Sequence, residues 1–215
     1  MKIVSVSAGL NQPSSTRLLA DRLSQATVAA LETEGTTATV ETIELRDLAH
    51  DITNALVTGF PAGQLPGALG EITNANGIIA VTPIFTASYS GLFKSFVDIL
   101  DRGSLTGMPV LLGATGGTAR HSLALDYAVR PLFTYLHADV VTTAVFAATD
   151  DWAGEGDSVN PLPQRIERAG RELAAKILAA GRERPADPFT AVPDFADLLG
   201  VSAATPNGGN AAGSR

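Results

Sequence analysis

A pair of adjacent glycines between an apolar run and an amphipathic stretch is the feature of this sequence with the clearest chemistry. Residues 114–121 read Ala-Thr-Gly-Gly-Thr-Ala-Arg-His, after the apolar residues 108–113 and before the amphipathic residues 122–136. This pattern predicts a strand that ends in a Gly-Gly turn and leads into a helix. Because Gly116 and Gly117 have no Cβ, a flat or anionic ligand can approach the backbone N–H groups of the turn closely.

A second loop, near the N-terminus, is rich in hydroxyl groups. Ser7 ends a short β-branched segment, and Ser14, Ser15 and Thr16 stand where a helical pattern begins. Capping a helix uses one hydroxyl, whereas several hydroxyls around a helix N-terminus favour an anion such as a phosphate. We interpret this loop as a phosphate site, with capping as the alternative, and Arg17 as either a phosphate ligand or a surface residue. The loop has neither a G-x-G-x-x-G nor a Walker A pattern, which disfavours dinucleotide and nucleoside triphosphate sites of those types.

A third loop, residues 82–94, combines a proline, an aromatic ring and small hydroxylated residues. Pro83 restricts the chain at the exit of a predicted strand, and Gly91 begins the next predicted helix. Phe85 with small neighbours fits a loop that wraps one edge of a flat ring. The alternative is an ordinary connection between strand and helix, with Phe85 in the core. Taken together, the three loops describe a site for a planar, phosphorylated cofactor.

The loops must be positioned by elements whose patterns alternate along the chain. Strands are predicted at residues 2–8, 39–45, 77–82, 108–113 and 139–146. Helices are predicted at residues 14–34, 64–74, 91–101, 122–136 and 161–180, and residues 50–63 are predicted to be a loop with a short helix. This alternation predicts an α/β fold: a three-layer, doubly wound, five-stranded parallel sheet of the flavodoxin-like type, in the order 2-1-3-4-5. Ligands of such sheets lie at the carboxyl ends of the strands, so all three loops are expected on one rim.

The composition limits the kinds of partner. The chain has 215 residues, of which 45% are hydrophobic and 17% charged, and its net charge is −7. This charge argues against bulk binding to nucleic acid or to an anionic membrane surface. The absence of cysteine excludes disulfides and thiolate metal sites, and no metal site is expected. No stretch approaches the roughly 20 apolar residues of a membrane span. The chain enters a strand pattern at once, leaving no room for a signal peptide, so we expect a cytoplasmic protein.

The end of the chain differs in character from the rest. Residues 1–181 are predicted to form one flavodoxin-like domain, and residues 182–215 a C-terminal extension. From about residue 203 the extension is rich in Gly, Ala, Asn and Ser, which predicts disorder. Ahead of that stretch the extension carries apolar residues that fit contact with the domain or with a neighbouring subunit: Phe189, Val192, Phe195, Leu198 and Leu199.

Three motifs, in order, resemble those of a known family. They are Thr82-Pro83-x-x-x-Ala87-Ser88-x-Ser90-Gly91-x-x-Lys94, then Ala114-Thr115-Gly116-Gly117, then Leu125-Asp126-Tyr127-Ala128-x-x-Pro131. The series resembles the NAD(P)H-dependent FMN reductase family over about residues 1–150, and it is most similar to the reductase components of two-component flavin monooxygenases. The chain departs from the family in the first loop, where Gly-Ser-x-Arg is common and this sequence has Gly9-Leu10-Asn11-Gln12.

The resemblance implies reduction of FMN by NAD(P)H and delivery of reduced FMN to a partner monooxygenase. Hydride transfer from nicotinamide to flavin needs stacking more than an acid–base pair, so no catalytic residue is assigned. The implied phosphate contacts are Ser7, Ser14, Ser15 and Thr16. The implied ring contacts are Pro83, Ile84, Phe85 and Thr86, and the implied pyrimidine-edge contacts are Gly116, Gly117 and Thr118. The resemblance also implies that helix 122–136 packs between subunits of a homodimer or homotetramer.

Other functions stay open at the level of sequence. The same site suits an enzyme that keeps FMN as a prosthetic group and reduces quinones, azo dyes or metal oxyanions. A non-enzymatic electron carrier of the flavodoxin type is compatible with the charge of −7. The sequence does not distinguish NADPH from NADH. Arg120 and His121 stand at a predicted helix start, where cations are unfavourable unless an anion lies nearby. His121 is equally compatible with a plain capping or surface role.

Overall fold

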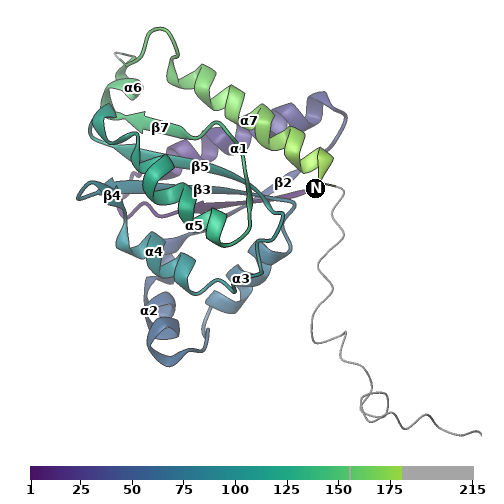
Figure 1. Ribbon diagram of the computed structural model, residues 1–215, viewed down its shortest axis with the longest axis vertical. Helices are drawn as coiled ribbons and strands as arrows, with labels where there is room; N and C mark the ends of the chain where they lie inside the picture. Colours follow the sequence, from purple (N-terminus) through teal and green to yellow (C-terminus); the bar gives the residue numbers. More distant parts are fainter. Residues whose placement is uncertain (155, 181–215) are drawn as a thin grey trace, which may run out of the picture. The chain divides into compact units, whose positions relative to one another are not determined.

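The computed structural model describes residues 1–154 and 156–180, which form a sheet with helices on both faces (Figure 1). The strands are β1 Lys2–Ser7, β2 Thr39–Glu44, β3 Gly77–Phe85, β4 Ser88–Tyr89, β5 Pro109–Gly116, β6 Asp139–Val140 and β7 Val145–Ala148. The helices are α1 Ser15–Thr33, α2 Ala49–Thr58, α3 Leu65–Thr73, α4 Gly91–Asp98, α5 Arg130–Tyr135, α6 Thr149–Ala153 and α7 Leu162–Ala179. Two 3-10 turns, Leu45–Leu48 and Ala119–His121, and a π-helical segment, Leu125–Val129, complete the series.

The parallel sheet has the order β2-β1-β3-β5, and both β6 and β7 pair with β5 at its far edge. The predicted α/β, doubly wound, flavodoxin-like fold is therefore confirmed. The predicted count of five strands is wrong, because the described residues contain seven. The order 2-1-3-4-5 holds only if β6 and β7 together are counted as the fifth position and the short antiparallel β4 is left out.

The fifth position is split by a bulge that the sequence pattern does not reveal. Val110 pairs with Val140 and Gly113 pairs with Val145, so β5 advances three residues while its partner advances five. The two extra residues cannot follow the ladder of hydrogen bonds. Two carbonyl groups of the bulge instead accept hydrogen bonds from the guanidinium of Arg130, at 2.9 and 3.0 Å. Residues 139–146 are rich in β-branched side chains, so their pattern predicts a single strand, although the middle of this segment leaves the sheet.

The third strand also differs from its prediction, because it continues past Thr82 and turns back on itself. Phe85 pairs with Ser88 across a two-residue turn formed by Thr86 and Ala87. These two residues have φ values of 48° and 67°. Positive φ at both central positions defines the type I′ turn, which matches the twist of a hairpin. The predicted loop 82–94 is therefore a hairpin followed by α4.

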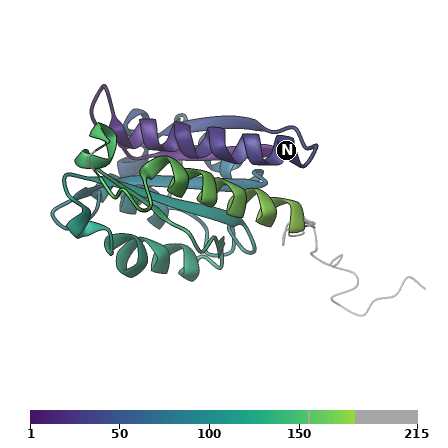
Figure 2. The same ribbon diagram turned by 90° about the horizontal axis from the view of Figure 1, so that it is seen from above.

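Each strand sends alternate side chains to two separate cores. On one face α1 and α7 run side by side (Figure 2), packed on residues such as Ile3 and Ile79. Figure 1 shows α2, α3, α4 and α5 covering the other face, where Val4 and Ile78 lie. This alternation is the two-residue period of a β-strand buried on both faces. The sheet is consequently rigid up to its carboxyl edge, where the loops begin.

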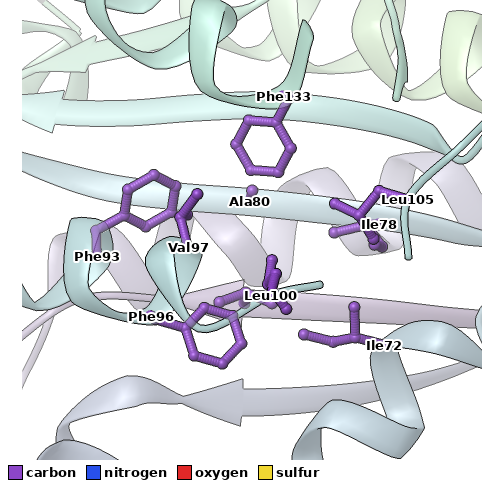
Figure 3. Close-up of a pocket in the computed structure, with 10 residues that line it drawn as sticks. Ile72, Ile78, Ala80, Phe93, Phe96, Val97, Leu100, Leu105 and Phe133 are labelled. Carbon is purple, nitrogen blue, oxygen red and sulfur yellow. The ribbon is translucent and has the colours of Figure 1, made fainter. Parts of the chain in front are cut away.

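The second core is packed almost without voids. The gap shown in Figure 3, between α4, α5 and the sheet, holds only about 10 Å³ and is lined by apolar side chains such as Phe93, Phe96 and Phe133. This space is at the lower limit of what one water molecule needs, and its apolar lining offers a water no hydrogen-bond partner. It is a packing defect of the core and offers no binding site.

Two helical predictions differ in detail from the structure. Residues 50–63 were predicted to be a loop with a short helix, and the structure has that helix as α2, which occupies most of the segment. Its pattern is weak because only Ile52 and Ala55 of the helix are buried, while Val57 is exposed. The helix expected at 122–136 is irregular: the π-helical segment Leu125–Val129 precedes α5, next to Pro131, whose ring nitrogen has no N–H to donate.

The predicted C-terminal extension, residues 182–215, lies outside the described residues, as do its apolar pattern and the disorder predicted from residue 203. Within residues 1–154 and 156–180, no helix has both the length and the apolar character that crossing a membrane requires.

Candidate functional site

A cleft of about 380 Å³ opens at the carboxyl ends of β1, β3, β5 and β7. It is lined by Gly9, Leu10, Asn11, Pro13, Ser14, Ser15, Thr16, Pro83, Ile84, Phe85, Thr115, Gly116, Gly117, Ala147, Thr149 and Trp152. In a doubly wound sheet this is the edge at which ligands bind, because the loops on either side of the reversal in strand order diverge there. A cleft of this volume is in the range of small-molecule sites.

Eight of the eleven residues predicted from the sequence line this cleft: Ser14, Ser15, Thr16, Pro83, Ile84, Phe85, Gly116 and Gly117. The other three lie close to it in sequence but do not line it. Ser7 is fully buried at the end of β1. Thr86 is exposed at the tip of the hairpin, and Thr118 is exposed just before a 3-10 turn. The structure thus brings all three predicted loops to one cleft.

The first loop is shaped by its own serine. Ser14 is the N-cap of α1, where its Oγ accepts a hydrogen bond from the Arg17 N–H at 3.2 Å. A Cβ at Gly9 would overlap the Ser14 hydroxyl, so only glycine fits there. Ser15, in contrast, is exposed and its hydroxyl makes no hydrogen bond to any described residue. Capping therefore uses one hydroxyl of the group, and Ser15 stays available to a ligand.

Thr16 connects the first loop to the third. Its Oγ1 lies 2.8 Å from the Oγ1 of Thr115, and both side chains are buried. Since either oxygen can donate, the pair holds the first turn of α1 against the end of β5. Thr16 faces the cleft from within this contact, so its hydroxyl is already partly satisfied without a ligand.

The two glycines of the third loop have different surroundings. A Cβ at Gly116 would lie 2.8 Å from the ring of Phe146, so this residue is needed for packing. A Cβ at Gly117 would meet no atom within 4 Å, and its surroundings are open. β5 continues through Gly116, three residues beyond the predicted strand end at Gly113. Gly117 is therefore the residue at which the backbone leaves the sheet and becomes accessible.

A fourth segment also lines the cleft, and the sequence patterns did not single it out. It comprises Ala147 near the end of β7 and Thr149 and Trp152 of α6. Trp152 is half-buried, and the guanidinium of Arg22 lies 5.1 Å from its ring centroid. The rule that placed the first three loops at the carboxyl edge applies equally to the loop after the last strand. That rule, together with the single tryptophan of the chain, was a usable signal.

Five further residues line the cleft that were not among the eleven predicted contacts, although they belong to the loops expected at this rim. Gly9, Leu10, Asn11 and Pro13 belong to the loop whose serines were singled out, and Thr115 precedes the glycine pair.

Arg17 does not point a free charge at the cleft. Its Nε donates to Asp21 at 2.8 Å and its Nη1 donates to Glu44 at 2.6 Å. The hydrogen bond to Asp21, with a smaller contribution from Glu44, raises the pKa of Arg17 above its ordinary value. Of the two interpretations left open by the sequence, these pairings favour a structural role.

The arrangement fits a flat group that carries a phosphate. The buried Oγ of Ser7, just before the first loop, has no hydrogen-bond partner among the described residues. The start of α1 provides a hydroxyl and the positive end of a helix dipole. On the other side of the cleft, Gly117 leaves the backbone uncovered and Phe85, 45% exposed, offers an apolar surface. Among the described residues that line the cleft, no pair is suited to acid–base or nucleophilic catalysis.

Comparison with known families agrees with this geometry. A family model described as NADPH-dependent FMN reductase matches residues 1–153. An FMN reductase (NADPH) of Pseudomonas aeruginosa is 35% identical over 184 residues, which cover 85% of this chain and 95% of that protein. An NADH-dependent FMN reductase, SfnF, of Pseudomonas fluorescens is 34% identical over 174 residues, which cover 81% of this chain and 90% of that protein.

A solved structure is similar over most of its length. It is an oxidoreductase from Corynebacterium diphtheriae with 46% sequence identity to this chain and a TM-score of 0.79, covering 83% of this chain and 97% of that one. The matched family region ends at residue 153 and so contains the strands, the cleft loops and Trp152.

Proposed function

The chain belongs to the NADPH-dependent FMN reductase family, and from this membership we propose where FMN lies in the cleft and what the reduced flavin is for. The enzyme is an NAD(P)H-dependent FMN oxidoreductase. In our proposal the cleft holds the flavin within residues 1–181, and the reduced flavin passes to a partner monooxygenase. The observation that carries the site is the convergence of three loops, predicted separately, on one cleft at the carboxyl edge of the sheet.

In the proposed arrangement the first loop holds the phosphate. Ser15 has a hydroxyl without a hydrogen bond to any described residue at the start of α1, and the first backbone N–H groups of the helix lie at the same end. Ser14 and Thr16 shape this cradle, because one caps the helix and the other is bonded to Thr115. The buried hydroxyl of Ser7 lies at the end of β1, just before the first loop, and gains a partner if the phosphate or a water reaches it.

The second and third loops would hold the ring. Pro83, Ile84 and Phe85 present an apolar wall, with Thr86 at its outer end. Backbone N–H groups at Gly116, Gly117 and Thr118 are candidates to face the pyrimidine edge, where negative charge is best stabilised by such donors. When bound, FMN supplies the ability to accept a hydride from the nicotinamide. The protein supplies position, exclusion of water on one side of the ring, and these donors.

A role in supplying a monooxygenase is supported by the openness of the cleft to solvent. Leu10, Phe85 and Gly117 are all exposed at its rim. No described charged side chain lines the cleft. Such a site suits a flavin that enters, is reduced and leaves. The same proposal includes a homodimer or homotetramer, because Leu123 and Tyr127 are 62% and 79% exposed one helical turn apart.

Steady-state kinetics with varied FMN and with both nicotinamides test the proposal. NADPH or NADH oxidation should saturate with added FMN, and the protein should leave gel filtration without a flavin spectrum. A protein that stays yellow and reduces quinones faster than it turns over free FMN overturns the supply role in favour of a prosthetic flavin.

A variant tests the phosphate assignment separately. Ser15→Ala should raise the dissociation constant of FMN several-fold while leaving that of riboflavin, which has no phosphate, nearly unchanged. Ser158→Ala, at an exposed serine outside the cleft, is the matched control. Equal effects of Ser15→Ala on FMN and riboflavin would place the phosphate elsewhere.

A further inference from the structure

The turn at the start of the first loop is held by an arginine from another element. Nη1 of Arg46 donates a hydrogen bond to the carbonyl oxygen of Asn11 at 3.1 Å. With the Gln12 amide turned so that its oxygen faces the guanidinium, that oxygen accepts from Arg46 as well, at 3.1 Å from Nη1. Arg46 lies in the 3-10 turn after β2, 35 residues from Asn11 in the sequence.

These contacts matter because residues 9–13 of the loop have no other hydrogen bond to a described residue. Residues 9–13 make no backbone–backbone hydrogen bond to any part of the chain that the structure describes. The ladder of β1 ends with the bond from the Ala8 N–H to Val81, and helix bonding resumes with the Leu18 N–H to Ser14. Within residues 9–13, the hydrogen bonds come from Arg46 alone among the described residues. A loop of this kind is flexible unless side chains fix it.

The guanidinium is itself held in place. Its Nη2 lies 2.7 Å from Oε2 of Glu44, the last residue of β2. The other oxygen of Glu44 accepts from Arg17, in the first turn of α1. The side chains of Arg46 and Glu44 are only 17% and 16% exposed. One carboxylate thus connects both sides of the first loop: its turn through Arg46, and the helix that follows it through Arg17.

The register of the sheet explains why Glu44 can do this. Ser7 pairs with Glu44, so the end of β2 lies beside the end of β1, where the loop begins. Arg46 does not line the cleft, whereas Gly9, Leu10 and Asn11 do. The arginine therefore contacts the loop from behind, and its charge is used within the protein.

We propose that Arg46, oriented by Glu44, is a positioning residue that fixes the first loop in the shape that binds the phosphate of the flavin. The proposal rests on the phosphate assignment made under the proposed function. Its consequence is selective: loss of Arg46 loosens the phosphate cradle but not the hairpin or the glycine turn. Affinity for a phosphorylated flavin falls, while affinity for a flavin without phosphate is affected much less.

The test is the ratio of two dissociation constants, for FMN and for riboflavin, measured by quenching of flavin fluorescence in Arg46→Met and in the wild type. Methionine approximates the apolar stem of arginine but has no hydrogen-bond donors. We expect the ratio of the FMN constant to the riboflavin constant to rise about tenfold. Arg46→Lys, which keeps the charge near Glu44 but cannot serve several acceptors at once, should fall between the two.

Arg130→Met is the matched control. Like Arg46, Arg130 pairs with a carboxylate, Asp126, and donates to backbone carbonyl oxygen, but its two carbonyl acceptors lie at the bulge between β6 and β7. Arg130→Met should lower the melting temperature without changing the ratio of the FMN to the riboflavin dissociation constant. If Arg46→Met lowers stability as Arg130→Met does and leaves the ratio unchanged, the inference is wrong.

Failure of the phosphate assignment gives a different result. In that case Ser15→Ala leaves the ratio unchanged as well. A raised ratio in Ser15→Ala combined with an unchanged ratio in Arg46→Met keeps the phosphate site and rejects only the positioning role.

Discussion

Neighbouring glycines of one turn have different tasks at the level of single residues. Gly116 is needed because the ring of Phe146 occupies the place of a side chain, whereas nothing occupies that place at Gly117. A substitution at Gly116 therefore disturbs packing, and a substitution at Gly117 disturbs only what enters the cleft. A substitution at Gly117 can therefore test ligand binding without an effect on packing.

Gly117→Leu should raise the dissociation constant of FMN about tenfold or more, because the new side chain extends into open space over the cleft. The free energy of unfolding should change little. Gly67→Leu is the control, since a Cβ at that exposed position also meets no atom within 4 Å but lies in α3, outside the cleft lining. Unchanged FMN affinity in Gly117→Leu would show that the flavin does not approach this turn.

Trp152 offers a second test at the level of residues. Trp152→Ala removes the larger of the two aromatic side chains that line the cleft, and we expect FMN binding to weaken about three- to tenfold. Isothermal titration of FMN measures this. Tyr135→Ala is the control, because Tyr135 is also an aromatic ring beside an arginine, with the Arg102 guanidinium 5.0 Å from its centroid, but it is not part of the cleft. A loss of affinity common to both variants would contradict a role of Trp152 in the site.

At the scale of elements, the packing of α1 against α7 includes a close approach of the two backbones at Gly170. A Cβ at Gly170 of α7 would lie 2.8 Å from the backbone of Ala26 in α1. In an exposed helix, alanine is more favourable than glycine by about 1 kcal/mol. At Gly170 the steric overlap outweighs this preference, because backbone atoms of α1 cannot move aside without shifting the helix.

We therefore expect Gly170→Ala to lower the free energy of unfolding by about 1–3 kcal/mol. Gly70→Ala, in α3, should raise it by about 0.5–1 kcal/mol, since a Cβ there meets no atom within 4 Å. Urea denaturation of both variants measures the difference in sign. Stabilisation by Gly170→Ala would mean that the two helices are farther apart than described.

The hairpin after β3 is the second element with a testable strain. Thr86 and Ala87 both adopt positive φ, where Asn and Gly are the favoured residues of a type I′ turn. Replacing the pair by Asn-Gly should stabilise the protein by about 1–2 kcal/mol, or a few degrees in melting temperature. Differential scanning calorimetry measures it. As a comparison, His137→Gly should stabilise by a similar mechanism, because exposed His137 also has a positive φ, at the end of α5.

If the Asn-Gly pair lowers the melting temperature while His137→Gly raises it, the hairpin conformation is not the strained one described. Binding of FMN to the Asn-Gly variant is informative too. An unchanged affinity would show that the wall formed by Pro83, Ile84 and Phe85 does not depend on the residues at the tip.

At the scale of the whole molecule, the sequence predicted what local patterns encode. Helix α1 was predictable from the capping serine and the stop at Gly35, which has a φ of 73°. The cleft was predictable because parallel strands end at one edge. The bulge after β6 and the contact of Arg46 with Asn11 were not predictable, since both depend on the register between strands. Register joins residues far apart in the chain, and no local pattern records it.

The oligomeric state is a further property of the whole molecule, and it can be tested in solution. Leu123 and Tyr127 are exposed on the irregular helical segment before α5, at 62% and 79%. A second exposed apolar pair, Val57 and Phe60, lies at the end of α2, at 82% and 77%. An apolar pair buried between subunits contributes to association, whereas an exposed pair does not.

The proposed oligomer uses the first pair, so Leu123→Ser with Tyr127→Ser should reduce the molar mass in solution. Val57→Ser with Phe60→Ser, which removes a comparable apolar surface, should leave it unchanged. Light scattering coupled to gel filtration measures both. The opposite outcome would move the interface to α2, and a monomeric wild type would reject the oligomer.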